Sequence, residues 1–246
     1  MKRIPAVLTA ILFLFASSIF SPAVAETVDL TILHINDFHG NLLPKPGKEG
    51  KPATGGMAYI AKMVAEEREK NPGGTLLLSA GDMFQGTPIS NLFRGKPVIE
   101  AMNRMGFDAM TLGNHEFDWG MEAFGDLRKA AAFPFLSANI VDEKGALLPG
   151  VKPYVIFQRK GLKVAVIGIT TPETHYATKP ENLKGYRVIA VEKSLPALIE
   201  KVKKEGAGPV VVLSHMGLDE DREMASRVSG IDLIVGGHSH TEVKTP

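Results

Sequence analysis

The 246-residue chain contains no cysteine, which excludes disulfide bonds, thiolate zinc sites and cysteine nucleophiles. It also lacks an excess of charge of either sign, since 28 basic and 27 acidic residues leave a formal net charge of +1, and no block of lysine or arginine stands out. This balance argues against a nucleic-acid-binding surface. Neither a G-x-x-x-x-G-K-[ST] loop nor an H-E-x-x-H helix is present, so the sequence supports neither P-loop chemistry nor a helical zinc-protease site.

The first 25 residues have the pattern of a secretory signal peptide. Lys2 and Arg3 precede the apolar run "IPAVLTAILFLFASSIF", and Ala23 and Ala25 form an A-x-A cleavage site. The alternative is a membrane anchor, because the run is close to the lower length limit of a membrane span. The small residues at its end favour cleavage after Ala25. We therefore expect a periplasmic or secreted protein without a stable membrane anchor.

The rest of the chain alternates strand-like runs with helical patterns. Runs such as "TLLLSA", "FPFLSANI", "KVAVIGIT", "PVVVLS" and "IDLIVGG" are β-branched and apolar, as in strands buried on both faces. Helices are expected within residues 55–70, 95–106 and 194–206, the last with Ser194 as its N-cap and Gly206 beyond its end. This alternation predicts an α/β layered fold with a largely parallel sheet.

One segment breaks the alternation. Residues 153–170, "PYVIFQRKGLKVAVIGIT", contain two strand-like runs joined at Lys160 and Gly161, which predicts an antiparallel hairpin. The fold should therefore contain a mixed sheet, or a second sheet beside the parallel one.

Polar side chains follow five of the predicted strands, at the point where each strand ends. In an open α/β sheet, ligands bind beyond the carboxyl ends of parallel strands. We therefore expect these side chains to converge on one crevice. They come from the stretches "NDFHG", "GDMFQG", "GNHEFDWG", "SHMG" and "GGHSH", and the candidates are Asp37, His39, Asp82, Asn114, His115, Asp118, His215, His238 and His240.

Carboxylate, imidazole and amide ligands without thiolate suit divalent ions such as Zn, Mn, Fe or Co. Seven candidate ligands exceed the needs of one ion, so two ions that share a carboxylate are expected, with Asp82 as the bridge. Such ions activate water and clamp the oxygens of a phosphoryl displacement. In an extended segment, residues i and i+2 point the same way. On that basis Asp37 and His39 should hold one ion together, and His238 and His240 have the same spacing.

The five stretches, in this order, resemble the calcineurin-like metallophosphoesterases, and they are closest to the secreted 5′-nucleotidase and UDP-sugar hydrolase branch. The resemblance runs from about Leu30 to His240. It implies a four-layer α/β/β/α sandwich with mixed sheets and a dinuclear metal centre. It also assigns Asp37, His39, Asp82 and His240 to one metal ion, and Asp82, Asn114, His215 and His238 to the other.

The resemblance also implies the roles of the residues around Asn114. His115 would not bind metal but would stabilise phosphoryl charge or protonate the leaving oxygen, and Asp118 would fix its tautomer and orientation. Glu116 has no assignable role, so we expect it to be solvated or to serve packing.

The resemblance implies a nucleotide or another small phosphate ester as substrate. The leading interpretation is a metal-dependent hydrolase of phosphate esters that acts on extracytoplasmic 5′-nucleotides. In that branch a C-terminal substrate-binding domain follows the catalytic domain. We expect residues 26–246 to form the catalytic domain here, and the sequence ends at Pro246 without the second domain. Two alternatives stay open: a 2′,3′-cyclic-nucleotide phosphodiesterase or thiosulfate-ester hydrolase relative, and a truncated, non-catalytic metal-binding module. The sequence does not indicate an oligomeric state.

Overall fold

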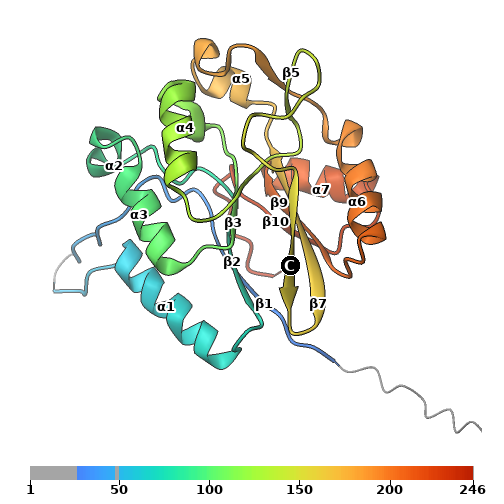
Figure 1. Ribbon diagram of the computed structural model, residues 1–246. Helices are drawn as coiled ribbons and strands as arrows, with labels where there is room; N and C mark the ends of the chain where they lie inside the picture. Colours follow the sequence, from blue (N-terminus) through green and yellow to red (C-terminus); the bar gives the residue numbers. More distant parts are fainter. Residues whose placement is uncertain (1–26, 48–49, 246) are drawn as a thin grey trace, which may run out of the picture.

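The computed structural model describes residues 27–47 and 50–245, so the predicted signal peptide lies outside the described residues (Figure 1). None of the helices it describes has the length and apolar character needed to cross a membrane. The strands are β1 (Thr31–Ile35), β2 (Thr75–Ser79), β3 (Ala109–Thr111), β4 (Phe135–Leu136), β5 (Ile140–Asp142), β6 (Tyr154–Arg159), β7 (Leu162–Thr170), β8 (Tyr186–Val188), β9 (Val210–His215) and β10 (Leu233–Val235). The α-helices are α1 (Met57–Lys70), α2 (Pro88–Leu92), α3 (Lys96–Met105), α4 (Gly120–Ala130), α5 (Thr174–Ala177), α6 (Leu195–Lys204) and α7 (Leu218–Arg227).

The strands form two main sheets. The first sheet has the strand order β1-β2-β3-β4, and each pair of adjacent strands in it is parallel. The second has the order β10-β9-β7-β6, in which only the β6–β7 pair is antiparallel. This pair is the predicted hairpin, and its turn residues Lys160 and Gly161 both have positive φ, 44° and 83°, which suits a two-residue turn between twisted strands. Strands β5 and β8 form a small antiparallel sheet of their own.

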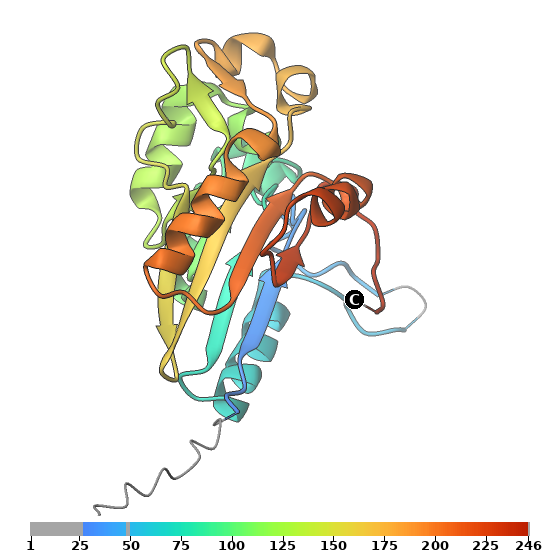
Figure 2. The same cartoon turned by 90° about the vertical axis from the view of Figure 1, so that its right-hand side faces the viewer.

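The two main sheets pack face to face between two layers of helices. Helices α1, α3 and α4 cover the first sheet, whereas α6 and α7 cover the second; Figure 2 shows α6 and α7 in front of the second sheet. Side chains alternate between faces along each strand. Leu77 of β2 faces the helices, and its neighbours Leu76 and Leu78 face the second sheet. The four-layer α/β/β/α sandwich is therefore confirmed.

One local expectation is wrong, and another holds only for the position of the residue. The run "FPFLSANI" does not form one strand, because β4 ends at Leu136 and β5 begins at Ile140 in another sheet. The chain passes close to β7 here: a Cβ on Gly168 would lie 2.5 Å from Leu136 Cβ, and the amide of Ala138 donates to the carbonyl of Gly168. Ser194 does precede α6, but its side chain donates to the carbonyl of Val191 and does not cap the helix.

Helix α7 is tied to the end of β9 by a buried carboxyl group. Asp221 is 7% exposed, and the hydroxyl of Ser214 donates to its Oδ1 at 2.5 Å. Burial raises the pKa of Asp221 to about 6, against the opposing effect of the Ser214 hydrogen bond. The native state therefore binds this proton more tightly than the unfolded chain, whose carboxyl group has a pKa near 3.8.

This shift predicts how stability depends on pH. A carboxyl group with a raised native pKa destabilises the fold as pH rises, here from about pH 4 until slightly above pH 6. The substitution Asp221→Asn removes this effect while keeping an acceptor for Ser214. Between pH 5 and pH 8, the wild type should lose on the order of 1–1.5 kcal/mol of unfolding free energy relative to the variant. Urea denaturation of both proteins in chelator-containing buffer measures the difference, and parallel pH profiles would contradict it.

Candidate metal centre

The predicted ligands converge beyond the carboxyl ends of the strands in both main sheets. Asp37 and His39 follow β1, Asp82 follows β2, His215 ends β9, and His238 and His240 follow β10. Their ligand-type atoms form two groups in which all atoms lie within 4.8 Å of one another. These groups are Asp37, His39 and His240, and Asp82, His215 and His238. The backbone amide of His238 donates to Asp37 Oδ2 at 3.0 Å, which connects the two groups.

The backbone at these positions is strained. In the described part of the chain, seven residues other than glycine have positive φ, a conformation that costs roughly 1–2 kcal/mol for an L-residue. Five of the seven are candidate ligands: Asp37 (50°), His39 (47°), Asp82 (54°), His238 (78°) and His240 (52°). Strain concentrated in this way is typical of functional sites.

The expectation that the ligand pairs lie in extended segments is therefore wrong, although Asp37 and His39 do lie in the same group. Positive φ at both residues brings these two together, not an extended strand. His238 and His240 fall in different groups.

His215 brings a buried nitrogen close to a carboxylate in the second group. The ring of His215 is fully buried, and its Nδ1 donates to the carbonyl oxygen of Ala80 at 2.6 Å. Its Nε2 lies 3.1 Å from Asp82 Oδ2 but has no hydrogen-bond partner, and Asn114 Oδ1 is likewise buried and unpartnered. Although burial opposes protonation of His215, the neighbouring Asp82 carboxylate raises its pKa to about 9. The protonated ring pairs with this carboxylate, whereas in the neutral ring a lone pair faces it. Such buried acceptors need a shared proton or a metal ion between them.

The first group repeats this arrangement at a more exposed position. His39 Nδ1 donates to the carbonyl oxygen of Gln85 at 2.8 Å, which leaves the Nε2 lone pair free. That Nε2 lies 3.3 Å from His240 Nε2, and His240 Nε2 lies 3.3 Å from Asp37 Oδ1. Three potential ligand atoms therefore face one another. The side chain of His240 is 60% exposed, whereas that of Asp37 is 5% exposed.

The ring of His238 is held by a side chain that the sequence analysis did not single out. His238 Nε2 lies 2.9 Å from Oε2 of Glu173, at the start of α5. When Nε2 donates to this carboxylate, Nδ1 is the nitrogen left for a ligand, as in carboxylate–histidine–metal arrangements. The hydrogen bond to His238 lowers the pKa of Glu173. Only the fold reveals this contact, because 65 residues separate the partners.

His115 lies beside the metal-ligand candidates and is held by Asp118, as expected. His115 Nδ1 lies 2.7 Å from Asp118 Oδ2, and the ring packs edge-on against His39 with 5.2 Å between centroids. The hydrogen bond to Asp118 raises the pKa of His115, against the effect of burial. The backbone amide of His115 also donates to Asp82 Oδ1 at 2.9 Å. A protonated imidazole can therefore donate from Nε2 beside the candidate ligands.

Glu116 is neither solvated nor merely packed. It is 1% exposed, and its carboxylate accepts hydrogen bonds from the backbone amides of Asp82, Met83 and Gly113. Burial raises its pKa to about 7, and the amide hydrogen bonds oppose a further rise. The position of Glu116 two residues after Asn114 was a signal in the sequence, but two of its three donors, Asp82 and Met83, come from a distant segment of the chain.

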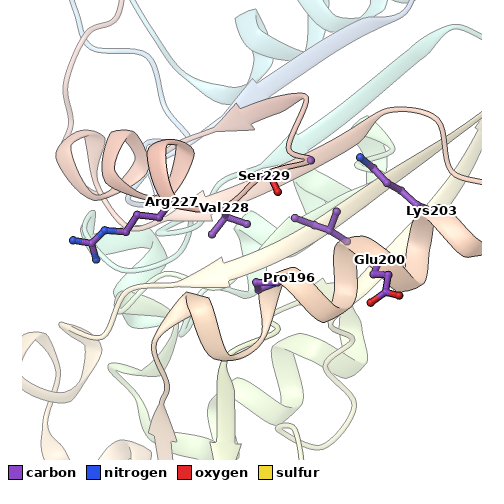
Figure 3. Close-up of a pocket in the computed structure, with 8 residues that line it drawn as sticks. Pro196, Glu200, Lys203, Arg227, Val228 and Ser229 are labelled. Carbon is purple, nitrogen blue, oxygen red and sulfur yellow. The ribbon is translucent and has the colours of Figure 1, made fainter.

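Two surface pockets of the structure lie away from this centre. Figure 3 shows a pocket of about 350 Å³ between α6 and the segment after α7, lined in part by Lys203 and Arg227. Arg227 is already paired with Glu192 and Glu223. A second pocket of about 450 Å³ lies beside β8. Neither contains a candidate ligand, so the chemistry of the side chains, not the depth of a hollow, identifies the site.

The sequence profile of calcineurin-like phosphoesterases matches residues 30–242. The chain belongs to this family. It is 39% identical to the snake venom 5′-nucleotidase of Crotalus adamanteus over 90% of this chain and 38% of that protein. The 5′-nucleotidase precursor of Thermus thermophilus superposes with a TM-score of 0.78 and 35% identity, covering 88% of this chain and 43% of that one. A sulfate thiohydrolase of Thermus thermophilus gives a TM-score of 0.81 and 27% identity, covering 90% and 50%.

Calcineurin-like phosphoesterases use divalent metal ions, and the donor set of this chain fits such ions. His215 Nε2, beside Asp82, and Asn114 Oδ1 are buried atoms without a hydrogen-bond partner, and imidazole, carboxylate and amide groups are the ligands that such ions accept. The chain spans about two fifths of the length of the curated 5′-nucleotidases that it matches.

A substitution at Gly113 tests this geometry, because the atoms around Gly113 leave no room for a side chain. An added Cβ would lie 2.2 Å from Asp82 Oδ1 and 2.7 Å from His215 Nε2. Gly113→Ala should therefore force these groups apart, weaken Mn²⁺ binding at least tenfold in isothermal titration calorimetry, and cost about 1–3 kcal/mol of stability through overpacking.

Gly125→Ala is the matched control. Gly125 lies within α4, and a Cβ there would meet nothing within 4 Å. Alanine should stabilise this helix by roughly 0.5–1 kcal/mol and leave the Mn²⁺ affinity unchanged. Equal Mn²⁺ affinities in the two variants would refute the proposed packing of ligands around Gly113.

Proposed function

We propose that this protein is a metal-dependent phosphoesterase that hydrolyses 5′-nucleotides. The observation that carries the proposal is the meeting of two groups of metal-ligand side chains with a carboxylate-supported histidine, His115, at one edge of the fold. The curated relatives named 5′-nucleotidase, at 35–39% identity over most of the chain, support a nucleotide as substrate.

Two divalent ions would be held by the side chains described above. Asp37, His39 and His240 would bind one, and Asn114, His215 and His238 the other, with Asp82 between them. When bound, such ions lower the pKa of a coordinated water molecule and neutralise charge on phosphoryl oxygens. The identity of the metal is open among Zn, Mn, Co and Fe, because oxygen and imidazole ligands suit all four.

The protein's own residues would orient the substrate and manage the proton. Asp118 holds His115 at Nδ1, so a proton on Nε2 points away from this carboxylate and is available to the phosphoryl group or the leaving oxygen. The carbonyl groups of Gln85 and Ala80 and the carboxylate of Glu173 keep the three ligand rings in fixed orientations. A site with fixed donors loses little energy to reorganisation during the reaction.

The first 25 residues and the rest of the chain would have separate roles. Residues 1–25 would act as a cleavable signal peptide that directs the protein to the periplasm or the medium, and residues 26–246 would form the catalytic domain. The substrates would then be extracytoplasmic nucleotides or other small phosphate esters. Edman sequencing or mass spectrometry of exported protein tests the cleavage after Ala25.

His115→Ala should separate catalysis from metal binding. Removing the proton donor should lower kcat for 5′-AMP by about 10²–10⁴-fold, whereas metal content by elemental analysis should stay at the wild-type value. The control is His34→Ala, since His34 is an exposed residue of β1 and should not change the rate.

Loss of metal in the His115→Ala variant would show that His115 is a ligand. Wild-type protein that binds two ions but hydrolyses neither 5′-AMP, 2′,3′-cyclic AMP nor a chromogenic phosphate ester would point to a metal-binding module. Turnover of a thiosulfate ester alone would favour the thiohydrolase alternative.

A further inference from the structure

Glu116 is a fully buried carboxylate directly behind the candidate metal centre. It lies in the short 3-10 turn His115–Phe117, between the proposed proton donor and the apolar core. Burying a carboxylate costs free energy unless hydrogen bonds compensate for lost water. Its presence at this position therefore needs a physical reason beyond filling space, which an apolar side chain of similar size would do without that cost.

The hydrogen bonds of Glu116 join two segments that carry candidate ligands. Oε2 accepts from the backbone amides of Asp82, at 2.9 Å, and Gly113, at 2.7 Å. Oε1 accepts from the amide of Met83 at 2.9 Å. Asp82 and Met83 follow β2, whereas Gly113 precedes Asn114 after β3. One carboxylate thus binds both segments at the point where their side chains turn toward the centre.

The strands themselves do not hold these segments together. Strands β2 and β3 are paired only at Leu78–Ala109 and Ser79–Met110, so the ladder ends before either ligand is reached. Beyond it, Asp82 has a strained φ of 54°. Glu116 supplies acceptors for three amides that the ladder leaves without backbone partners. Charge-assisted hydrogen bonds of this kind are about twice as strong as neutral ones.

We propose that Glu116 is a positioning residue, which sets the separation of Asp82 and Asn114 so that both can bind the same cation. The inference rests on the proposed function for the identity of that centre, but it concerns metal affinity and can be tested without turnover. The position of His115 depends on the same two segments, because its backbone amide donates to Asp82 Oδ1.

Glu116→Gln is the informative variant. Glutamine keeps the volume but has one acceptor oxygen, and its NH₂ group would face an amide donor. At least one of the three amides is then left unpaired, and the two segments can drift apart. The affinity for Mn²⁺, measured by isothermal titration calorimetry, should fall at least tenfold. The visible spectrum of the Co²⁺-loaded protein should change, because the coordination of the ion between Asp82 and Asn114 is altered.

Asp108→Asn is the matched control at the opposite end of the same two strands. Asp108 also accepts a backbone hydrogen bond, from Leu77 of β2 at 2.8 Å, and pairs with Arg159. This variant should lower the thermal unfolding temperature but leave the Mn²⁺ affinity and the Co²⁺ spectrum unchanged. A general loss of stability is thereby separated from loss of positioning.

A double-mutant cycle with Asn114→Ala decides whether Glu116 acts through the ligands. Once Asn114 is removed, Glu116→Gln should weaken Mn²⁺ binding by much less than it does in the wild type. If Glu116→Gln does not fold, the same measurements apply to Glu116→Asp, whose shorter carboxylate cannot reach both segments.

Wild-type Mn²⁺ affinity and an unchanged Co²⁺ spectrum in a folded Glu116 variant would overturn the inference, as would full additivity in the cycle. A wild type that binds metal but hydrolyses no phosphate ester would refute the proposed function alone. The effect of Glu116 on metal affinity would still be measured in that case.

Discussion

The close approach of potential ligand atoms beyond the carboxyl ends of the two sheets is the constraint on which the rest of the structure depends. His215 Nε2 faces the carboxylate of Asp82, and His39 Nε2 faces His240 Nε2. In a neutral His215 ring the Nε2 lone pair meets a carboxylate, and because the ring is fully buried, water cannot screen the two groups. A proton or a metal ion between the acceptors makes the interaction attractive; although burial opposes protonation, the Asp82 carboxylate raises the pKa of His215 to about 9. The side chain of His240 is 60% exposed, so water screens the first group more strongly.

The apolar layers provide the stability that this arrangement requires. The sheets pack against each other through buried residues of β2, β7 and β9, and helices cover both outer faces. Burial of each large apolar side chain contributes about 1.5–3 kcal/mol. This is enough to hold several residues in left-handed conformations that cost roughly 1–2 kcal/mol each. Five of the seven strained residues lie in the segments after the strands, where the polar chemistry lies.

Around the candidate ligands lies a set of groups that orient them. Backbone carbonyl groups hold the rings of His39 and His215, and carboxylates hold those of His238 and His115. Glu116 acts one step further back, on the backbone of the segments that carry Asp82 and Asn114. Each of these contacts restricts a side-chain rotation or a backbone displacement that would change the positions of the candidate ligand atoms. The geometry of the centre thus depends on these supporting groups as well as on the candidate ligands themselves.

The sequence alone determined most of the strands, the hairpin at Lys160 and Gly161, and the candidate ligands, because these depend on local signals: apolar runs, turn residues and polar residues directly after a strand. It did not predict β8 or the break between β4 and β5. The family resemblance already implied how the ligands divide between two groups, whereas the tertiary structure decided which nitrogen of each ring is free. It also decided that Glu116 and Glu173 belong to the site. The reason is distance along the chain: His215 meets Ala80 across 135 residues, and His238 meets Glu173 across 65. No local pattern encodes such contacts; they arise only when the two sheets pack together.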